Sequence, residues 1–304
     1  MKTLIIGFGS IGKRHADVLK TLGCQPNLVT SQTVSDFQCY KNIEVALQHE
    51  SIDYAIIANP TYLHHQSLLD LIQCDYQGIV LVEKPLFAKN EELPKHNIAK
   101  ILVAYNLRFH KLLTEIKKLL EGENLVTYSA YVGQYLPTWR KNTDYRNSYS
   151  AKKEQGGGVL RDLSHELDYT LWLCGPCSYA TAIGGHLSHL EINSDDVYSI
   201  MMKCERCPVV NIHVNYLDRC VKREITINTE QHTFYVDFIK GTLSIDGNIQ
   251  SQCTDELPQT YVKQHQAVLN ENFDSFCTYS NGISVLTLIN TIEQASLAQK
   301  WMNL

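Results

Sequence analysis

The chain has 304 residues, which is enough for two domains of ordinary size. Hydrophobic residues make up 44% and charged residues 19% of it, and the formal net charge of −5 argues against a general attraction to nucleic acid. The apolar runs are strand-sized and fall far short of the ~20 residues that a membrane-spanning helix needs. Because the chain enters a strand at once without a charged leader, we expect a soluble, cytoplasmic protein with no membrane partner.

Strands and helices alternate over the first third of the chain. The predicted strands are Lys2–Ile6, Leu28–Thr30, Tyr54–Ala58 and Ile79–Val82, and the predicted helices are Ile11–Leu22, Asn42–His49 and Tyr62–Ile72. The strands are continuously apolar, which is typical of strands whose two faces are both covered by helices. We therefore expect an α/β domain with a doubly wound parallel sheet over residues 1–104.

The pattern changes after about residue 104. Longer segments with alternating polar and apolar residues now dominate, and these predict strands of an antiparallel or mixed sheet. The predicted strands are Leu125–Gln134, Tyr179–Leu187, Val197–Cys204, Val209–Leu217, Glu224–Thr229 and Thr233–Asp237, and the predicted helices are Leu112–Leu120, Val159–Leu173 and Leu286–Met302. Residues 105–304 should therefore form an α+β domain with a large open sheet, close against the first domain.

A glycine-rich turn joins the first predicted strand to the first predicted helix. It consists of Gly7, Phe8, Gly9, Ser10, Ile11 and Gly12. The first glycine allows a tight turn, the second lets the backbone approach a pyrophosphate, and the third permits close packing of helix on strand. The helix N-terminus supplies N–H groups for the phosphates. This context predicts a dinucleotide site in a Rossmann domain, although a protein that binds S-adenosylmethionine can carry a similar turn.

The choice between NAD and NADP depends on the end of the second strand. Sites specific for NAD usually place an acidic residue there, but this chain has Thr30, Ser31 and Gln32. A missing carboxylate removes the repulsion against a 2′-phosphate, which Ser31 could accept together with Lys13 or Arg14. We therefore expect NAD or NADP as the cofactor.

Glu83, Lys84 and Pro85 follow the last predicted strand of the first domain. Ligands bind at the carboxyl ends of the strands in open α/β sheets. A lysine at this edge can give a proton to, or take one from, the oxygen of a carbon that exchanges hydride, and Glu83 could hold its ammonium group. The tripeptide alone would equally fit a solvated ion pair at a strand exit.

Five segments taken together give the chain a family resemblance. They are GFGSIGKRH (7–15), ANPTYLHH (58–65), EKP (83–85), YNLRFH (105–110) and GGGVLRDLSHELDYTLWLCG (156–175). In this order they resemble the glucose-fructose oxidoreductase / inositol dehydrogenase (Gfo/Idh/MocA) family. The resemblance implies a Rossmann domain, a second domain with an open sheet, and oxidation or reduction of sugars or cyclitols with NAD or NADP. It also implies a homodimer or homotetramer formed through the C-terminal sheet.

The resemblance assigns roles to individual residues. Lys84 matches the catalytic lysine, and His165 matches a catalytic or substrate-orienting histidine. Asn59 and His64 match positions near the nicotinamide and ribose, and Arg108 matches a residue near the active site. The remaining cofactor contacts are expected from Ser31, Glu83 and the glycine turn.

The spacing between Asp162 and His165 departs from the family pattern. In the usual family pattern, Asp-x-x-x-His, the histidine comes four positions after the aspartate, whereas His165 comes three positions after Asp162. Residues three apart on one helix still share a face, so Asp162 could reach the site or orient the imidazole of His165.

The segment 135–150 combines aromatic residues, hydroxyl groups and two arginines before the glycine run. Trp139 and Tyr145 suit a polyhydroxylated ring, and Arg140 and Arg146 suit a carboxylate or phosphate. The segment is similar to a WR…DYR…YSA stretch in a family subgroup that is loosely associated with surface-polysaccharide sugars. The alternative interpretation is a surface loop whose aromatic residues only pack it against the domain.

Two Cys-x-x-Cys pairs could suggest a zinc site or a redox dithiol. Cys174 and Cys177 follow a predicted helix, whereas a redox pair normally begins one. Cys204 and Cys207 span a predicted hairpin turn. We therefore expect no metal and no redox function.

These observations favour hydride transfer between NAD(P) and a hydroxyl or carbonyl carbon of a sugar, sugar acid or nucleotide-sugar. Two alternatives stay open. One is a non-catalytic NAD(P)-binding sensor or assembly protein, and the other is an enzyme that recycles tightly bound NAD during elimination or epimerisation.

Overall fold

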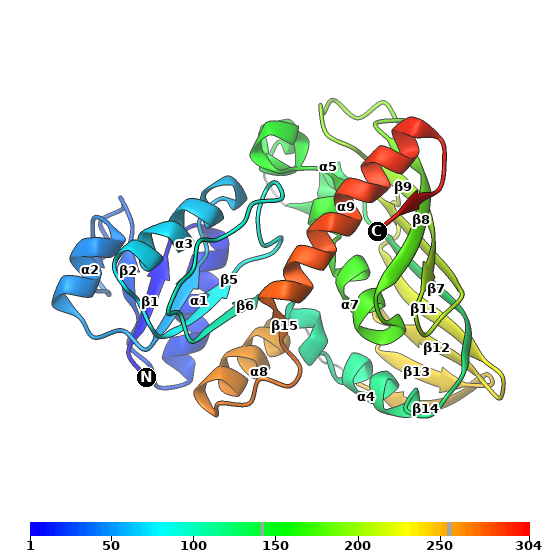
Figure 1. Ribbon diagram of the computed structural model, residues 1–304, viewed down its shortest axis with the longest axis horizontal. Helices are drawn as coiled ribbons and strands as arrows, with labels where there is room; N and C mark the ends of the chain where they lie inside the picture. The colour runs from blue at the N-terminus through cyan, green and yellow to red at the C-terminus, as the bar shows by residue number, and fades with distance from the viewer. Residues whose placement is uncertain (141–142, 254–256) are drawn as a thin grey trace. The chain divides into compact units, whose positions relative to one another are not determined.

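A computed structural model describes residues 1–140, 143–253 and 257–304, and it divides into two compact units (Figure 1). The first unit contains residues 1–109 and the described part of 256–283, and the second contains the described part of 110–255 and residues 284–304. The segment 257–283 was expected in the second domain but packs in the first unit. The functional boundary between residues 104 and 105 stays a prediction.

The first unit contains a seven-stranded sheet in the order β15-β6-β5-β4-β1-β2-β3. All neighbouring strands are parallel except β15, which pairs antiparallel with β6. The strands are β1 (Thr3–Ile6), β2 (Asn27–Val29), β3 (Cys39–Tyr40), β4 (Tyr54–Ile57), β5 (Ile79–Val82), β6 (Lys100–Val103) and β15 (Cys277–Thr278). The predicted doubly wound parallel sheet is confirmed, and β3, β6 and β15 are additional to the predicted strands.

Three helices lie at the predicted places: α1 (Ser10–Thr21), α2 (Ile43–His49) and α3 (His64–Gln73), the last preceded by the short 3-10 helix η1 (Thr61–Leu63). The unit also contains α8 (Leu257–Leu269) and the 3-10 helix η2 (Asn106–Phe109), which were not predicted. α1 buries the side of the helix that carries His15, Val18 and Leu19. Asn42 caps the start of α2, since its side chain accepts a hydrogen bond from the main-chain nitrogen of Val45 at 2.9 Å.

α8 completes the core of the first unit, although it comes from far along the chain. Val268 and Phe276 are buried in one cluster with Ile5, Leu19 and Leu28. In Figure 1 the orange α8 lies beside the blue α1, in agreement with the contacts between the two helices.

The second unit contains a nine-stranded sheet in the order β14-β13-β12-β11-β7-β10-β9-β8-β16. β10 pairs parallel with β7, and the other neighbours are antiparallel, which confirms a large mixed sheet. The strands are β7 (Leu125–Gly133), β8 (Cys177–Gly185), β9 (Val197–Cys204), β10 (Val209–Asn215), β11 (Lys222–Thr229), β12 (Thr233–Asp237), β13 (Thr242–Ile245), β14 (Asn248–Gln252) and β16 (Met302–Asn303). Buried and exposed residues alternate along β9, as expected for a sheet with one covered face.

The helices of the second unit include α5 (Leu136–Trp139) and three 3-10 helices that were not predicted, and two of the predicted helices differ in extent. They are α4 (Lys111–Leu119), α5 (Leu136–Trp139), α6 (Val159–Asp162), α7 (His165–Cys174) and most of α9 (Tyr279–Ala298), with η3 (Tyr145–Asn147), η4 (Tyr149–Ala151) and η5 (Lys153–Gln155). The single helix predicted over 159–173 is wrong, because Leu163 and Ser164 interrupt it. The last helix begins and ends earlier than predicted. Within the described residues, none of the helices combines the length and apolar character needed to cross a bilayer.

Candidate active site and cofactor site

The glycine turn lies between β1 and α1, at the carboxyl edge of the parallel sheet. Gly7 has a φ of +97°, and a Cβ at this position would lie 2.6 Å from the main-chain nitrogen of Asn59. A Cβ on Gly12 would collide with the carbonyl oxygen of Gly7. A Cβ on Gly9, by contrast, would meet nothing within 4 Å. The fold therefore requires Gly7 and Gly12, whereas the open space beside Gly9 fits a ligand.

The start of α1 has the properties of an anion site. Gly9 is the N-cap residue and provides no side-chain acceptor, and the first turn carries no acidic residue. Ser10 is exposed and Ile11 is half-buried, while the Phe8 ring is buried and contacts the Phe37 ring at 5.5 Å. Helical N–H groups without a protein acceptor attract phosphate oxygens. The turn therefore fits the pyrophosphate of a dinucleotide.

The end of β2 carries no carboxylate, as the sequence shows. The side-chain amide of Gln32 donates to the carbonyl oxygen of Phe8 at 3.1 Å, and its main-chain nitrogen donates to Thr30 Oγ1 at 3.1 Å. Ser31 is exposed between them. Gln32 therefore ties the strand exit to the glycine turn, and Ser31 is accessible to a ligand.

His64 connects the exits of β4 and β5. Its Nε2 lies 3.0 Å from the carbonyl oxygen of Asn59, and its Nδ1 lies 3.1 Å from the carbonyl oxygens of both Pro85 and Leu86. Burial lowers the pKa of His64, whereas the hydrogen bonds to the carbonyl oxygens of Asn59, Leu86 and Pro85 work to raise it. The Asn59 side chain donates to Ser67 Oγ at 2.8 Å. Asn59 and His64 thus shape the edge of the sheet next to Lys84.

Lys84 follows β5 directly and is half-buried. The carboxylate of Glu83 is buried and bonded at both oxygens: His15 Nε2 donates to Oε1 at 2.9 Å, and the main-chain nitrogen of Lys84 donates to Oε2 at 3.1 Å. Burial works to raise the pKa of Glu83, but the hydrogen bond from His15, the charge of Lys84 and the hydrogen bond from the main chain of Lys84 lower it. Glu83 is therefore an ionised group that holds the main chain of Lys84.

Arg108 lies in η2 and is only 3% exposed. Its Nη1 donates to the carbonyl oxygen of Phe276 at 3.0 Å, and the side chain of its neighbour Asn106 donates to Thr260 Oγ1. The segment around Arg108 is thus joined to the α8 segment. A substrate contact by Arg108 stays a proposal.

Asp162 and His165 lie in the second unit, on opposite sides of the break between α6 and α7. Asp162 ends α6 and is buried, whereas the half-buried His165 is the first residue of α7. The expectation that both lie on one continuous helix face is therefore wrong. Tyr216 donates to Asp162 Oδ2 at 2.6 Å. Burial, followed by the charge of Asp162, raises the pKa of Tyr216, so this hydroxyl stays protonated.

The glycine run before α6 is explained by close packing. A Cβ on Gly157 would collide with the carbonyl oxygen of Tyr149, and a Cβ on Gly158 would collide with the carboxylate of Asp195. Gly158 also has a φ of +118°. Asp195 Oδ2 accepts a hydrogen bond from the main-chain nitrogen of Leu160 at 3.0 Å, which holds the start of α6.

The aromatic and basic residues of segment 135–150 divide into two groups. Trp139, Arg140 and Tyr145 line a small pocket together with Leu136, Thr143, Ser148 and Ser150. Arg146 donates to both Asp144 and Glu191, so its charge is already balanced by two carboxylates. Lys141 and Asn142 lie outside the described residues. Arg140, whose guanidinium lies 5.1 Å from the Tyr149 ring centre, is the better candidate for an anionic substrate.

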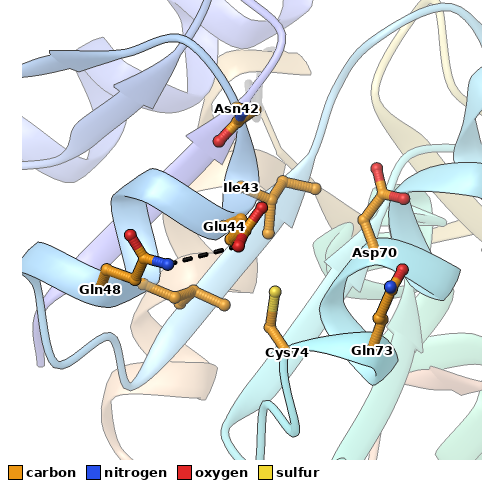
Figure 2. Close-up of a pocket in the computed structure, with 8 residues that line it drawn as sticks. Asn42, Ile43, Glu44, Gln48, Asp70, Gln73 and Cys74 are labelled. Carbon is orange, nitrogen blue, oxygen red and sulfur yellow. Dashed lines mark hydrogen bonds between the residues drawn. The ribbon is translucent and has the colours of Figure 1, made fainter.

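A surface pocket between α2 and α3 contains none of the predicted site residues (Figure 2). Its lining consists of Asn42, Ile43, Glu44, Leu47, Gln48, Asp70, Gln73 and Cys74. Asp70 and Gln73 belong to the last turns of α3, and α3 runs away from the carboxyl edge of the sheet. The pocket is therefore separate from the edge at which dinucleotides bind.

The two Cys-x-x-Cys segments face each other in the second unit. α7 ends at Cys174 and a turn joins β9 to β10 at Cys204 and Cys207, as predicted. The main-chain nitrogen of Arg206 donates to the carbonyl oxygen of Cys174 at 2.8 Å. All ten cysteines have free thiols, and within the described ranges no group of three or more His, Cys, Asp or Glu residues is arranged to hold a metal ion.

Two family models match most of the chain. Residues 1–99 match the Gfo/Idh/MocA oxidoreductase family with an NAD-binding Rossmann fold, and residues 114–244 match the Gfo/Idh/MocA C-terminal domain. The chain therefore belongs to the Gfo/Idh/MocA family of oxidoreductases, and its first unit carries an NAD-binding Rossmann domain. The resemblance found in the sequence motifs is confirmed.

Individual relatives are more distant. The 2,7-anhydro-N-acetylneuraminate hydratase of Escherichia coli (strain K12) is 23% identical over 227 residues, which cover 69% of this chain and 56% of the hydratase. The WlbA dehydrogenase from Bordetella pertussis, solved with NADH and UDP-GlcNAcA, has a TM-score of 0.80 and 18% identity, with 100% of this chain and 98% of that chain covered. A levoglucosan dehydrogenase solved with NADH has a TM-score of 0.84 and 16% identity over the same shares. These structures share the fold.

Sequence reasoning missed several residues beneath Lys84. His15 was part of a motif but received no role, and His265 and Tyr54 were not considered. The signal for His15 is its position on the buried side of α1, because a buried imidazole needs a polar partner. His265 has no comparable signal, since α8 reaches the first unit only through the fold.

Proposed function

We propose that this protein transfers hydride between NAD(P) and a hydroxyl or carbonyl carbon of a sugar, sugar acid or nucleotide-sugar. The observation that carries the proposal is Lys84 at the carboxyl edge of the parallel sheet, with its main chain bonded to the buried carboxylate of Glu83. The open space at Gly9 supports cofactor binding at the same edge of this sheet. The nicotinamide supplies the hydride donor or acceptor when it is bound.

Lys84 is proposed to exchange the proton on the substrate oxygen. Its ammonium would donate to the oxygen of a carbonyl that receives hydride, and its neutral form would accept the proton of a hydroxyl that loses hydride. His165 is proposed as the partner acid or base, because an imidazole can hold or release a proton near neutral pH. Asp162 is proposed to support the substrate end of the site through its charge.

An anionic sugar is the proposed substrate class. Trp139 and Tyr145 offer aromatic surface and Arg140 offers a cation around one pocket of the second unit. The WlbA dehydrogenase, solved in complex with the nucleotide-sugar UDP-GlcNAcA, supports this class by analogy. A role in surface-polysaccharide metabolism belongs to the same proposal. Arg108 is proposed as a further substrate-binding residue.

The cofactor contacts follow the edge of the first sheet. We propose that the glycine turn binds the pyrophosphate, that Ser31 approaches the adenosine ribose, and that Asn59, His64 and Glu83 surround the nicotinamide end. The neutral exit of β2 permits both NAD and NADP.

The assembly and location of the protein are part of this proposal. Ile183, Met201 and Val209 on neighbouring strands are 78%, 49% and 43% exposed, which favours a homodimer or homotetramer through the nine-stranded sheet. Free thiols at all ten cysteines favour the cytoplasm. Light scattering of the purified protein would test the assembly.

A second candidate is a reaction that uses tightly bound NAD without net consumption. One relative is a hydratase and not a dehydrogenase, which supports elimination or hydration through a keto intermediate as an alternative reaction. A non-catalytic NAD(P)-binding sensor is the third possibility, because the helix that should join Asp162 to His165 is interrupted.

The Lys84→Met variant tests the proposal, with Lys89→Met as a matched control on an exposed lysine of the same loop. We expect Lys84→Met to bind NADH normally but to lose turnover by about 100-fold or more, because proton transfer contributes on that scale. Lys89→Met should keep full turnover. Full activity of Lys84→Met would refute the assignment.

A further inference from the structure

Four buried polar side chains form a continuous hydrogen-bonded chain in the first unit. Tyr54 OH lies 3.0 Å from His265 Nδ1, His265 Nε2 lies 2.7 Å from His15 Nδ1, and His15 Nε2 lies 2.9 Å from Glu83 Oε1. Tyr54, His15 and His265 are fully buried, and Glu83 is 7% exposed. The chain ends at Glu83 Oε2, which accepts from the main-chain nitrogen of Lys84.

The charges of these groups define the direction of the hydrogen bonds. Burial lowers the pKa of His265 far below its usual value and raises that of Tyr54, so His265 is neutral and Tyr54 is protonated. The ionised Glu83 can only accept, so His15 donates from Nε2. The Tyr54 hydroxyl can donate to His265 Nδ1 only when His265 carries its proton on Nε2, and this proton is then donated to His15 Nδ1. This arrangement leaves none of these hydrogen-bonding atoms unsatisfied.

The chain connects elements that are distant in sequence. His15 belongs to α1, which begins at the glycine turn, and His265 belongs to α8. Tyr54 begins β4, and Glu83 follows β5. Buried polar groups often contribute less to the stability of the fold than apolar residues of the same size, and their usual advantage is that they fix one specific arrangement. Such a chain is therefore suited to hold the exit of β5 relative to the cofactor helix.

We propose that His265, His15 and Glu83 act as positioning residues for Lys84: His265 fixes the tautomer of His15, and His15 fixes a negative Glu83 beneath the main chain of Lys84. The proposal rests on the proposed function, in which Lys84 is the group that exchanges the substrate proton. Under this proposal, His265 from the segment 257–283 helps to position the catalytic lysine of the first unit.

Several other titratable groups surround the chain. The Tyr261 ring of α8 meets the edge of the His15 ring at 5.6 Å, and the Arg14 guanidinium lies 5.3 Å from the Tyr261 ring centre. The charges of Tyr76 and Cys24 raise the pKa of Tyr54, and the charge of Lys84 lowers the pKa of Glu83. A change in the chain is therefore expected to alter the pH dependence of turnover, because it alters the charge next to Lys84.

Nitrogen NMR of histidine-labelled protein with NADH bound tests the proposed tautomers without a substrate. We expect His15 and His265 to be neutral, with the proton on Nε2 in each ring. A proton on Nδ1 of His265, or a doubly protonated His15, would overturn the proposal. This measurement needs no variant except for signal assignment, so it does not depend on whether a core substitution folds.

The second test measures the turnover of variants with a sugar that the wild type converts. His265→Leu removes both hydrogen bonds, whereas the Gln side chain in His265→Gln can donate to His15 and accept from Tyr54. We expect kcat to fall about 100-fold in His265→Leu, with little change in the KM for NAD(P), since small displacements of a reacting group have effects of this size. His265→Gln should keep kcat within about tenfold of the wild type, with an unchanged pH profile.

The two proposals fail in different ways. If Lys84→Met is inactive but His265→Leu retains the kcat and pH profile of the wild type, the positioning proposal is wrong and the proposed function stands. If Lys84→Met is fully active, the catalytic assignment itself is wrong.

Discussion

Replacing Gly9 by alanine separates the needs of the fold from the needs of the cofactor. Gly9 has a φ of −77° and a ψ of −165°, which any residue adopts, and an added Cβ meets no atom within 4 Å. Gly9→Ala should therefore stabilise the free protein by about 0.4–1 kcal/mol, because alanine restricts the unfolded chain. The same methyl group would occupy the space in which a pyrophosphate approaches the turn.

The expected loss of cofactor affinity follows from the hydrogen bonds at the turn. One backbone hydrogen bond to a charged phosphate contributes about 1.5–3 kcal/mol, which corresponds to roughly 10- to 150-fold in Kd. Titration with NADH, followed by fluorescence, measures this change. Thermal unfolding of the free protein measures the stability in parallel.

Gly12→Ala is the matched comparison. Its Cβ would lie 3.0 Å from the carbonyl carbon of Gly7 and still closer to the oxygen, so α1 must move. We expect a loss of about 1–3 kcal/mol and a Tm lowered by several degrees. If Gly9→Ala binds NADH as tightly as the wild type, the cofactor does not approach the turn as argued.

Three further predictions concern individual side chains. Burial raises the pKa of Asp195 from 3.8 to about 6, so the folded protein favours the protonated carboxyl and loses stability as the pH rises through this range. Asp195→Asn carries no charge at any pH, so it should raise the Tm at pH ~8, with a gain that disappears toward pH ~4. Ser31→Asp should weaken NADP binding by about tenfold or more and leave NAD binding nearly unchanged, as measured by titration with both cofactors. Arg140→Ala should raise the KM for an anionic sugar more than Arg146→Ala, which should change the Tm by less than about 2 °C because its ion pairs are exposed. Equal KM values for the two variants would contradict the assignment of Arg140.

The sequence was sufficient for β1, β4 and β5 of the first sheet, because these strands are continuous apolar runs. Residues 54–57 and 79–82 lie inside the predicted strands, and the glycine turn stands between β1 and α1 as expected. The motif pattern was also sufficient for the family. These features depend on short segments of sequence, where periodicity and turn chemistry act directly.

The rest depends on contacts between distant segments. The helix break after Asp162 accompanies the packing of Gly158 against Asp195, which the local pattern does not contain. β3 and β15 are only two residues long, too short for a periodic signal. His265 reaches the Glu83 network because α8 packs on α1, so no motif near Lys84 could reveal it. The ion pair between Arg146 and Glu191 was equally hidden, because Glu191 lies far along the chain.

Hydride transfer itself is tested most directly by mixing the purified protein with NAD or NADP and a panel of sugars, sugar acids and nucleotide-sugars. The absorbance of the reduced nicotinamide is followed for the wild type and for Lys84→Met. We predict that at least one panel compound changes the absorbance with the wild type, and that Lys84→Met binds the cofactor without this change. A wild-type protein that binds NADH tightly but shows no change with any compound, in either direction, would contradict the account.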